Sequence, residues 1–137
     1  MEQGKKYGLI VLIFILTHGF AFSQNGTLSV TDRAKQAHGF LVSGNLEKAL
    51  EITNDLIHEK PEEPQFQDWA GYIWAVKGDF NKAVSYFEKE RDLLAQSTGS
   101  RKKDLADCLV KIGRCHNSLG NPDKAITDFA LSLKLFT

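Results

Sequence analysis

The sequence has few of the residues that interrupt helices and no charge excess that would attract a polyanion. Its 137 residues include 3 prolines, 2 cysteines and 1 methionine. Because a proline inside a helix removes a hydrogen bond and clashes with the preceding turn, so few prolines leave room for long helices. Lys plus Arg and Asp plus Glu number 17 each, so the formal net charge is zero. We therefore expect no nucleic-acid partner, which generally requires clustered excess Lys and Arg.

Local patterns of common catalytic and metal sites are also absent from the sequence. It contains no Gly-rich phosphate loop before a helix, no nucleophile turn and no His or Cys pair at metal-ligand spacing. Cys108 and Cys115 are separated by about 10.5 Å if they lie on one helix, which is too far for a disulfide bond. We expect two small buried side chains there, no metal, no cofactor and no enzymatic activity. An enzyme without any local signature is the alternative.

The chain opens with a basic, then apolar, then small-residue order. Lys5 and Lys6 precede an apolar run over residues 7–16, and Ala21-Phe22-Ser23 follows. This order is typical of a secretory signal. Residues 1–23 are therefore expected to be a signal peptide, residues 24–29 a linker, and the protein to be periplasmic or extracellular. The apolar run is shorter than the about 20 residues that span a bilayer, so an uncleaved anchor facing outward is the alternative and the only membrane contact expected.

The rest of the chain contains three copies of one local pattern, which begin at Gly44, Gly78 and Gly120. Each glycine is followed by Asn or Asp and then by Lys-Ala and an aliphatic residue. The pattern predicts a helix that ends at the glycine, a capped second helix, and a helix crossing at the alanine. The expected helices cover residues 31–43, 47–60, 64–77, 81–96, 103–119 and 122–135. Gly71 and Gly113 fall inside first helices, where a glycine is unfavourable and indicates tight packing.

These features resemble the tetratricopeptide repeat over about residues 30–136. Pro61 closes the first unit as in that family, and Phe87 and Phe129 stand at its aromatic positions, whereas Thr53 departs from them. The longer spacing around residues 97–100 resembles a 42-residue variant of the repeat. The resemblance implies an all-α, right-handed α-solenoid of about three helix-turn-helix repeats over residues 30–137. It also implies a concave groove, lined by first helices, that binds a protein or peptide.

Helical spacing identifies the side chains expected to face that groove. Partner binding is assigned to His38, Leu41, Asp68, Tyr72, Val76, Asp107, Arg114 and Asn117, with Ala34, Val42, Ala75 and Val110 beside them. Tyr72 and Arg114 are favoured contacts because aromatic and Arg side chains are enriched at binding hot spots. Arg114 and Asn117 alone do not form the family's basic clamp for acidic chaperone tails. Phe66, Trp69, Ile73 and Trp74 have the helical spacing of a core.

The last expected helix has an apolar face that no later element covers. Ile126, Phe129, Leu133 and Phe136 would be partly exposed, so we expect a longer protein, a partner or self-association at this end. Two functions follow. The first is an exported binding module or scaffold. The second, by analogy, is the extracytoplasmic sensor part of a bacterial membrane signalling protein such as a histidine kinase or regulator.

Overall fold

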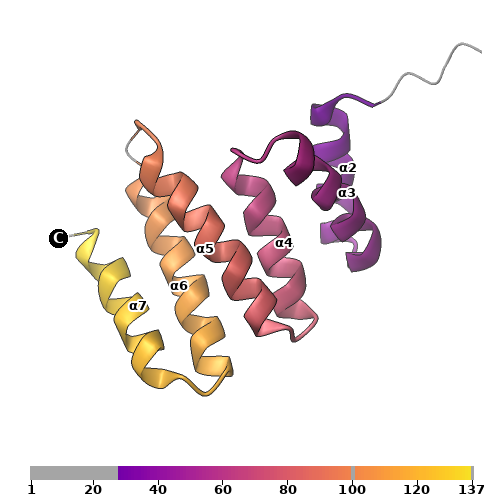
Figure 1. Ribbon diagram of the computed structural model, residues 1–137. Coiled ribbons are helices and arrows are strands. Elements are labelled where there is room, and N and C mark those ends of the chain that lie inside the picture. The colour runs from indigo at the N-terminus through magenta and orange to yellow at the C-terminus, as the bar shows by residue number, and fades with distance from the viewer. Residues whose placement is uncertain (1–27, 100, 137) are drawn as a thin grey trace, which may run out of the picture.

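The described part of the chain is a single row of antiparallel helices (Figure 1). The structure, a computed structural model, describes residues 28–99 and 101–136. The signal peptide and most of the linker expected from the sequence lie outside these residues. The helices are α2 (Val30–Val42), α3 (Leu46–Glu59), α4 (Pro64–Val76), α5 (Phe80–Gln96), α6 (Lys102–Ser118) and α7 (Pro122–Lys134). Each begins and ends within one residue of its expected bounds.

Every helix packs mainly against the helices before and after it in the chain. The three pairs α2–α3, α4–α5 and α6–α7 form a right-handed α-solenoid of helix-turn-helix repeats, which confirms the expected fold class. No helix among the described residues combines the length and apolarity needed to cross a bilayer.

Each pair is joined by a turn built on the recurring glycine. Gly44, Gly78 and Gly120 have φ of 77°, 81° and 75°, which a residue without a Cβ adopts at little cost. The side chains of Asn45 and Asp79 then accept hydrogen bonds from backbone N–H groups in the first turn of the following helix. The expectation that Asn121 does the same is wrong. Its φ is −111°, against −83° and −87° at the other two caps, because a proline follows it and favours a more extended backbone.

Glycines inside two first helices make room for an aromatic ring of the second helix. A Cβ on Gly71 would lie 2.6 Å from Phe87, and a Cβ on Gly113 would lie 2.6 Å from Phe129. In the first unit the equivalent positions hold Ala37 and Thr53, both fully buried. The smaller Thr53 replaces the ring, so an alanine replaces the glycine. This confirms the tight packing that the recurring glycine predicts.

The core is a series of buried clusters along the row of helices. Phe66 and Ile73 are buried and Trp69 and Trp74 are partly buried, as the sequence predicts. Cys108 is buried as a free thiol, and its Sγ–H donates to the backbone carbonyl of Phe87 at 3.1 Å. Burial raises the pKa of the Cys108 thiol, followed by the nearby Glu90 carboxylate. Together with the free, buried Cys115 this confirms the expected role of the two cysteines.

The turn glycine of the third unit stands eight residues later than the spacing of the first two would place it, and the helices absorb most of the difference. Helix α5 continues three residues beyond the end that α3 would predict, and α6 begins four residues earlier than α4 would predict. The connecting loop is one residue longer. The additional residues therefore extend the paired ends of α5 and α6 beyond the rest of the array.

Candidate functional site

The candidate binding residues lie at repeated positions on the first helices α2, α4 and α6. His38, Tyr72 and Arg114 each stand six residues before their turn glycine, so they occupy one register across the array. All three side chains are exposed, Tyr72 by 52%. His38 also stacks against Trp69 of the next first helix, with ring centroids 5.9 Å apart. This register provides an imidazole, a phenol and a guanidinium group to a ligand.

An apolar region adjoins this register at the carboxyl ends of α2 and α4. Val42 and Val76 hold equivalent positions two residues before the turn glycine, and they are 75% and 54% exposed. Leu41 is partly buried beside them, whereas the equivalent Asn117 of α6 is exposed. Exposed valine and tyrosine side chains at this end are suited to an apolar side chain of a partner.

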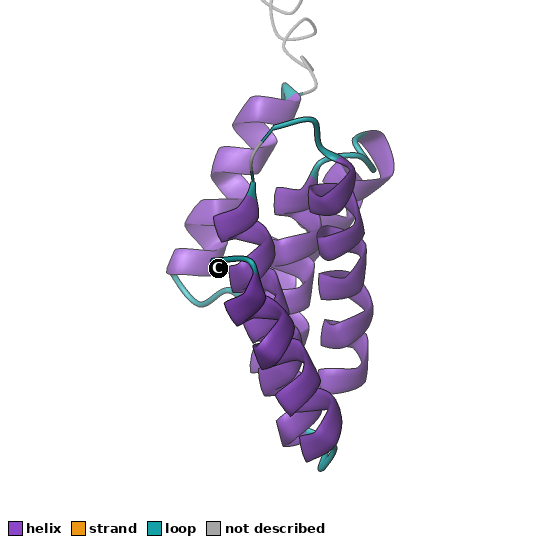
Figure 2. Cartoon of the chain, turned by 90° about the vertical axis from the view of Figure 1, so that its left-hand side faces the viewer, coloured by secondary structure: helices purple, strands orange, loops and turns teal. Residues whose placement is uncertain are grey.

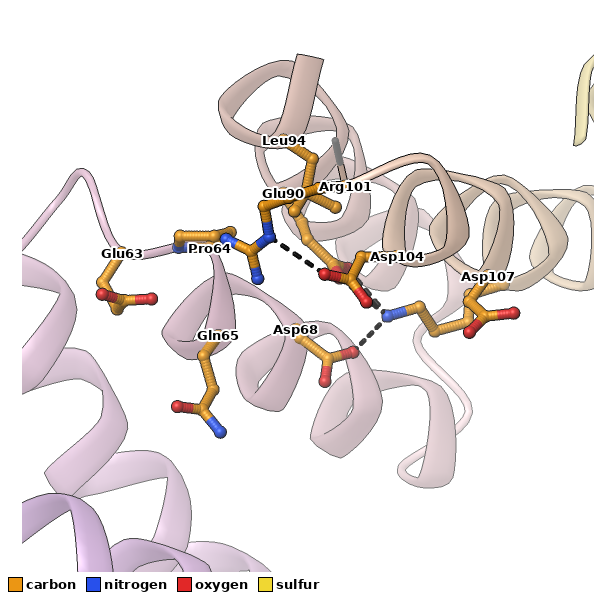
Figure 3. Close-up of a pocket in the computed structure, with 10 residues that line it drawn as sticks. Glu63, Pro64, Gln65, Asp68, Glu90, Leu94, Arg101, Asp104 and Asp107 are labelled. Atoms are coloured by element: carbon orange, nitrogen blue, oxygen red, sulfur yellow. Dashed lines mark hydrogen bonds and ion pairs between the residues drawn. The ribbon is translucent and has the colours of Figure 1, made fainter. Parts of the chain in front are cut away.

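The opposite, amino-terminal ends of α4 and α6 enclose a cavity of about 360 Å³ with the end of α5 (Figure 3). Of the candidate residues, the structure brings Asp68 and Asp107 together here and leaves the others outside the lining. Five acidic and two basic side chains line the cavity, so it has an excess of carboxylates. The lining residues are Glu63, Pro64, Gln65, Asp68, Glu90, Leu94, Arg101, Asp104, Asp107 and Lys111.

The extended start of α6 supplies part of this lining. Arg101 and Asp104 belong to the additional residues of the third unit, and their side chains form an ion pair at 2.9 Å. Both are substantially exposed, so the pair is weakly held and can rearrange around a ligand. The longer unit thus forms one wall of the cavity.

A partly buried ion cluster lines the cavity and links three helices. The Lys111 ammonium of α6 donates to both carboxylate oxygens of Glu90 in α5, at 3.0 and 2.9 Å, and to Asp68 of α4. Glu90 is only 6% exposed. Such a cluster fixes α4 and α6 relative to α5, because each charge loses its compensation if the partners separate.

Burial and neighbouring charges act in opposite directions on these groups. Burial raises the pKa of the Glu90 carboxyl group, and the Asp68 carboxylate adds to that rise, while Lys111 opposes both. Burial lowers the pKa of Lys111, but its bonds to Asp68 and Glu90 outweigh burial and leave that pKa raised. Lys111 therefore remains charged at neutral pH, and its charge is already neutralised by the two carboxylates.

Sequence reasoning missed this cluster, although the repeat contains a signal for it. Glu90 stands in the register of Leu56 in α3 and Ser132 in α7, and all three positions are buried. Lys111 likewise stands in the register of Trp69. A carboxylate and an ammonium at two core registers of adjacent helices indicate a buried pair.

His116 stands where the first two units have Phe40 and Trp74, and it joins the two helices of the third unit. Its Nδ1 lies 2.7 Å from Oδ2 of Asp128, and both side chains are largely buried. The described residues contain no group of three or more His, Cys, Asp or Glu side chains placed to hold a metal ion. The His116–Asp128 contact is a polar link between α6 and α7.

Solved structures with the same architecture have little sequence in common with this chain. The N-terminal domain of stress-induced protein-1 (STI-1) from C. elegans matches with a TM-score of 0.72 and 17% identity, over 78% of this chain and 84% of that one. A crystal structure of MamA matches with a TM-score of 0.68 and 16% identity, over 78% of this chain and 58% of that one. No protein-family model and no curated protein matches the sequence. The likeness establishes a tetratricopeptide-type helical repeat fold, and the 42-residue variant stays a prediction.

Proposed function

We propose that this protein is an exported interaction module, whose first helices bind a segment of another protein or a peptide. The observation that carries the proposal is the acidic cavity between α4 and α6, with the exposed Tyr72 and Val76 one and two turns further along α4 from Asp68 in its lining. The segment that fits these two features has a basic side chain for the cavity and an apolar side chain for the tyrosine and valine. The same surface offers no basic cluster for an acidic tail.

Charge supports a basic ligand group. Of the acidic side chains around the cavity, Glu90 and Asp68 share the ammonium of Lys111, and Asp104 pairs with Arg101. Asp107 is exposed on α6 beside them. A Lys or Arg side chain of a partner would therefore be attracted by the surplus carboxylates, at a site where the cavity partly excludes water and strengthens the attraction.

The positions on α4 also set the spacing expected in the ligand. Asp68 is one helical turn from Tyr72 and two turns from Val76, which corresponds to about 6 Å and about 12 Å along the helix. An extended peptide advances about 3.3 Å per residue. A segment lying along α4 should therefore carry its basic and apolar residues two to four positions apart.

Selection from a random peptide library on the immobilised protein tests this proposal. The enriched peptides should combine Lys or Arg with an aromatic or aliphatic residue at that spacing. Their binding should weaken about tenfold or more in Asp107→Lys and in Tyr72→Ala, since each change removes one side of the match. Enrichment of acidic peptides, or of no sequence at all, would refute the assignment.

Two variants on second helices serve as matched controls. Glu51→Lys makes the same change of charge at an exposed position of α3, and Tyr86→Ala removes a tyrosine from α5. Both should bind the selected peptides as tightly as the unaltered protein. If Glu51→Lys weakened peptide binding as much as Asp107→Lys does, the cause would be the change in net charge and not a local contact at Asp107.

Export is the second part of the proposal, and it rests on the basic, apolar and small-residue order of residues 1–23. Expression in a bacterial host followed by cell fractionation and N-terminal sequencing tests it. A processed chain that begins at Gln24 in the exported fraction supports the proposal. An intact chain that remains in the cytoplasm contradicts it.

A further inference from the structure

The two ends of the helical row have opposite polarity. Four positions of α4 that face α3 hold Phe66, Trp69, Ala70 and Ile73, of which three are buried and Trp69 is partly buried. The same registers of α2 hold Asp32, Lys35, Gln36 and Gly39, all exposed. The outer face of α2 is thus a polar surface that water can cover.

Helix α7 at the other end carries an apolar outer face. Val84 and Leu94 of α5 pack into the core cluster that includes α6 residues. Their equivalents are Ile126 on α7 and Phe136 just beyond its end, and each is 65% exposed. Leu133 between them is 69% exposed. In α5 these positions pack against α6, the first helix of the next unit. The same positions at the end of α7, the outermost helix at that end of the described row, present uncovered apolar side chains (Figure 2).

The spacing of these residues is that of a helix-pairing seam. Ile126 and Leu133 are seven residues apart on α7, and Ala130 stands between them in steps of four and three. Two such steps along a helix form one apolar stripe of the kind found in coiled coils. The exposed Ala130 lies on the same side, where its small side chain permits close approach of another helix.

We propose that this α7 face, defined by Ile126, Ala130, Leu133 and Phe136, pairs with the same face of a second copy about a two-fold axis. A head-to-tail arrangement would instead place the α7 face of one copy on α2 of the next. That contact would cover the exposed, charged Asp32 and Lys35 with apolar side chains, which is unfavourable. Of these two arrangements, the isologous one matches apolar surface with apolar surface, and it closes after two copies.

The exposed apolar area is sufficient for such a dimer. The three large side chains are about two-thirds exposed, and each has roughly 150–200 Å² of surface, so one copy provides about 300–400 Å². Apolar atoms make up about 60% of a typical interface. Two copies would therefore bury about 1,000–1,300 Å² in total, which reaches the lower range of specific interfaces.

Sedimentation equilibrium of the full chain and its variants, at concentrations from about 1 to 500 μM, tests the proposal. The unaltered protein should fit a monomer–dimer equilibrium. Leu133→Lys and Ile126→Lys should each raise the dissociation constant about 30-fold or more, because the charge is introduced on both copies. Val42→Lys changes an equally exposed apolar residue on the groove face and should leave the equilibrium unchanged. A monomer throughout, or an association that neither α7 variant weakens, would overturn the proposal.

Disulfide trapping distinguishes the isologous dimer from association through any other surface. Ala130→Cys lies near the expected two-fold axis, so mild oxidation should link two copies through this residue. Asn54→Cys places a thiol at the equivalent exposed position of α3 and should not become linked. The native Cys108 and Cys115 are buried, so the unaltered protein gives the background level of linkage. Linkage of the Asn54→Cys variant to the same extent, or none in Ala130→Cys, would refute the two-fold pairing of α7.

Discussion

Replacing Gly71 by alanine should destabilise the protein, although the same change in an ordinary helix does the opposite. Alanine in a helix interior is more favourable than glycine by about 1 kcal/mol. At position 71, however, the new Cβ would lie 2.6, 2.7 and 3.0 Å from three carbon atoms of the Phe87 ring. Phe87 is 2% exposed, so the ring has no free space into which it can move.

The expected magnitude follows from the balance of these two effects. Adding a methyl group to a tightly packed core costs about 1–3 kcal/mol, and contacts this short place Gly71→Ala in the upper part of that range. After the gain in helix propensity, a net loss of about 1–2 kcal/mol remains. For a domain of this size the loss corresponds to a fall in Tm of about 4–10 °C. Urea titration followed by far-ultraviolet circular dichroism measures it.

Gly39 provides the matched control within the same fold. It lies inside helix α2, but a Cβ there would meet nothing within 4 Å. Gly39→Ala should therefore stabilise the protein by up to about 1 kcal/mol. Adding Phe87→Leu to Gly71→Ala should recover part of the loss, since the smaller side chain leaves room for the methyl group. Equal stabilisation by both alanine substitutions would refute the packing explanation.

The ion cluster leads to two further predictions. Lys111→Met should lower the free energy of unfolding by about 1–3 kcal/mol because it leaves the buried Glu90 carboxylate without its partner, while Lys103→Met at an exposed position of α6 should change it little. Since the pKa of Glu90 is raised above 4.5 in the folded state, its contribution to stability is present below that pH and is lost as the pH rises through the folded value. Glu90→Gln should flatten this part of the pH profile in chemical denaturation, and an unchanged slope would contradict the assignment.

Most of the fold follows from local signals in the sequence. Each turn requires a residue with positive φ, and Gly44, Gly78 and Gly120 therefore mark the helix ends directly. The recurring Gly71 and Gly113 indicate close helix contact, and the rings of Phe87 and Phe129 lie opposite them. Such features depend on residues near one another in the chain, or on the same register in successive units.

The acidic cavity depends on contacts that no short pattern contains. Lys111 bonds to Asp68 and Glu90, which are 43 and 21 residues away, so the cluster appears only when α4, α5 and α6 are packed together. Asp68 and Asp107 were predicted as groove residues, but their shared cavity and its charge were not. The extended ends of α5 and α6 add Arg101 and Asp104, whose positions follow from helix lengths in the third unit.

The most direct measurement of the binding proposal is a map of the contact surface in solution. Titration of the isotope-labelled protein with a library-selected basic peptide, followed by NMR, locates the perturbed amide groups. The largest shifts are expected along α4 and the first half of α6, around Asp68, Tyr72, Val76 and Asp107. Shifts confined to α3, α5 or α7 would place the ligand on the second helices and contradict the proposed role of the first-helix surface.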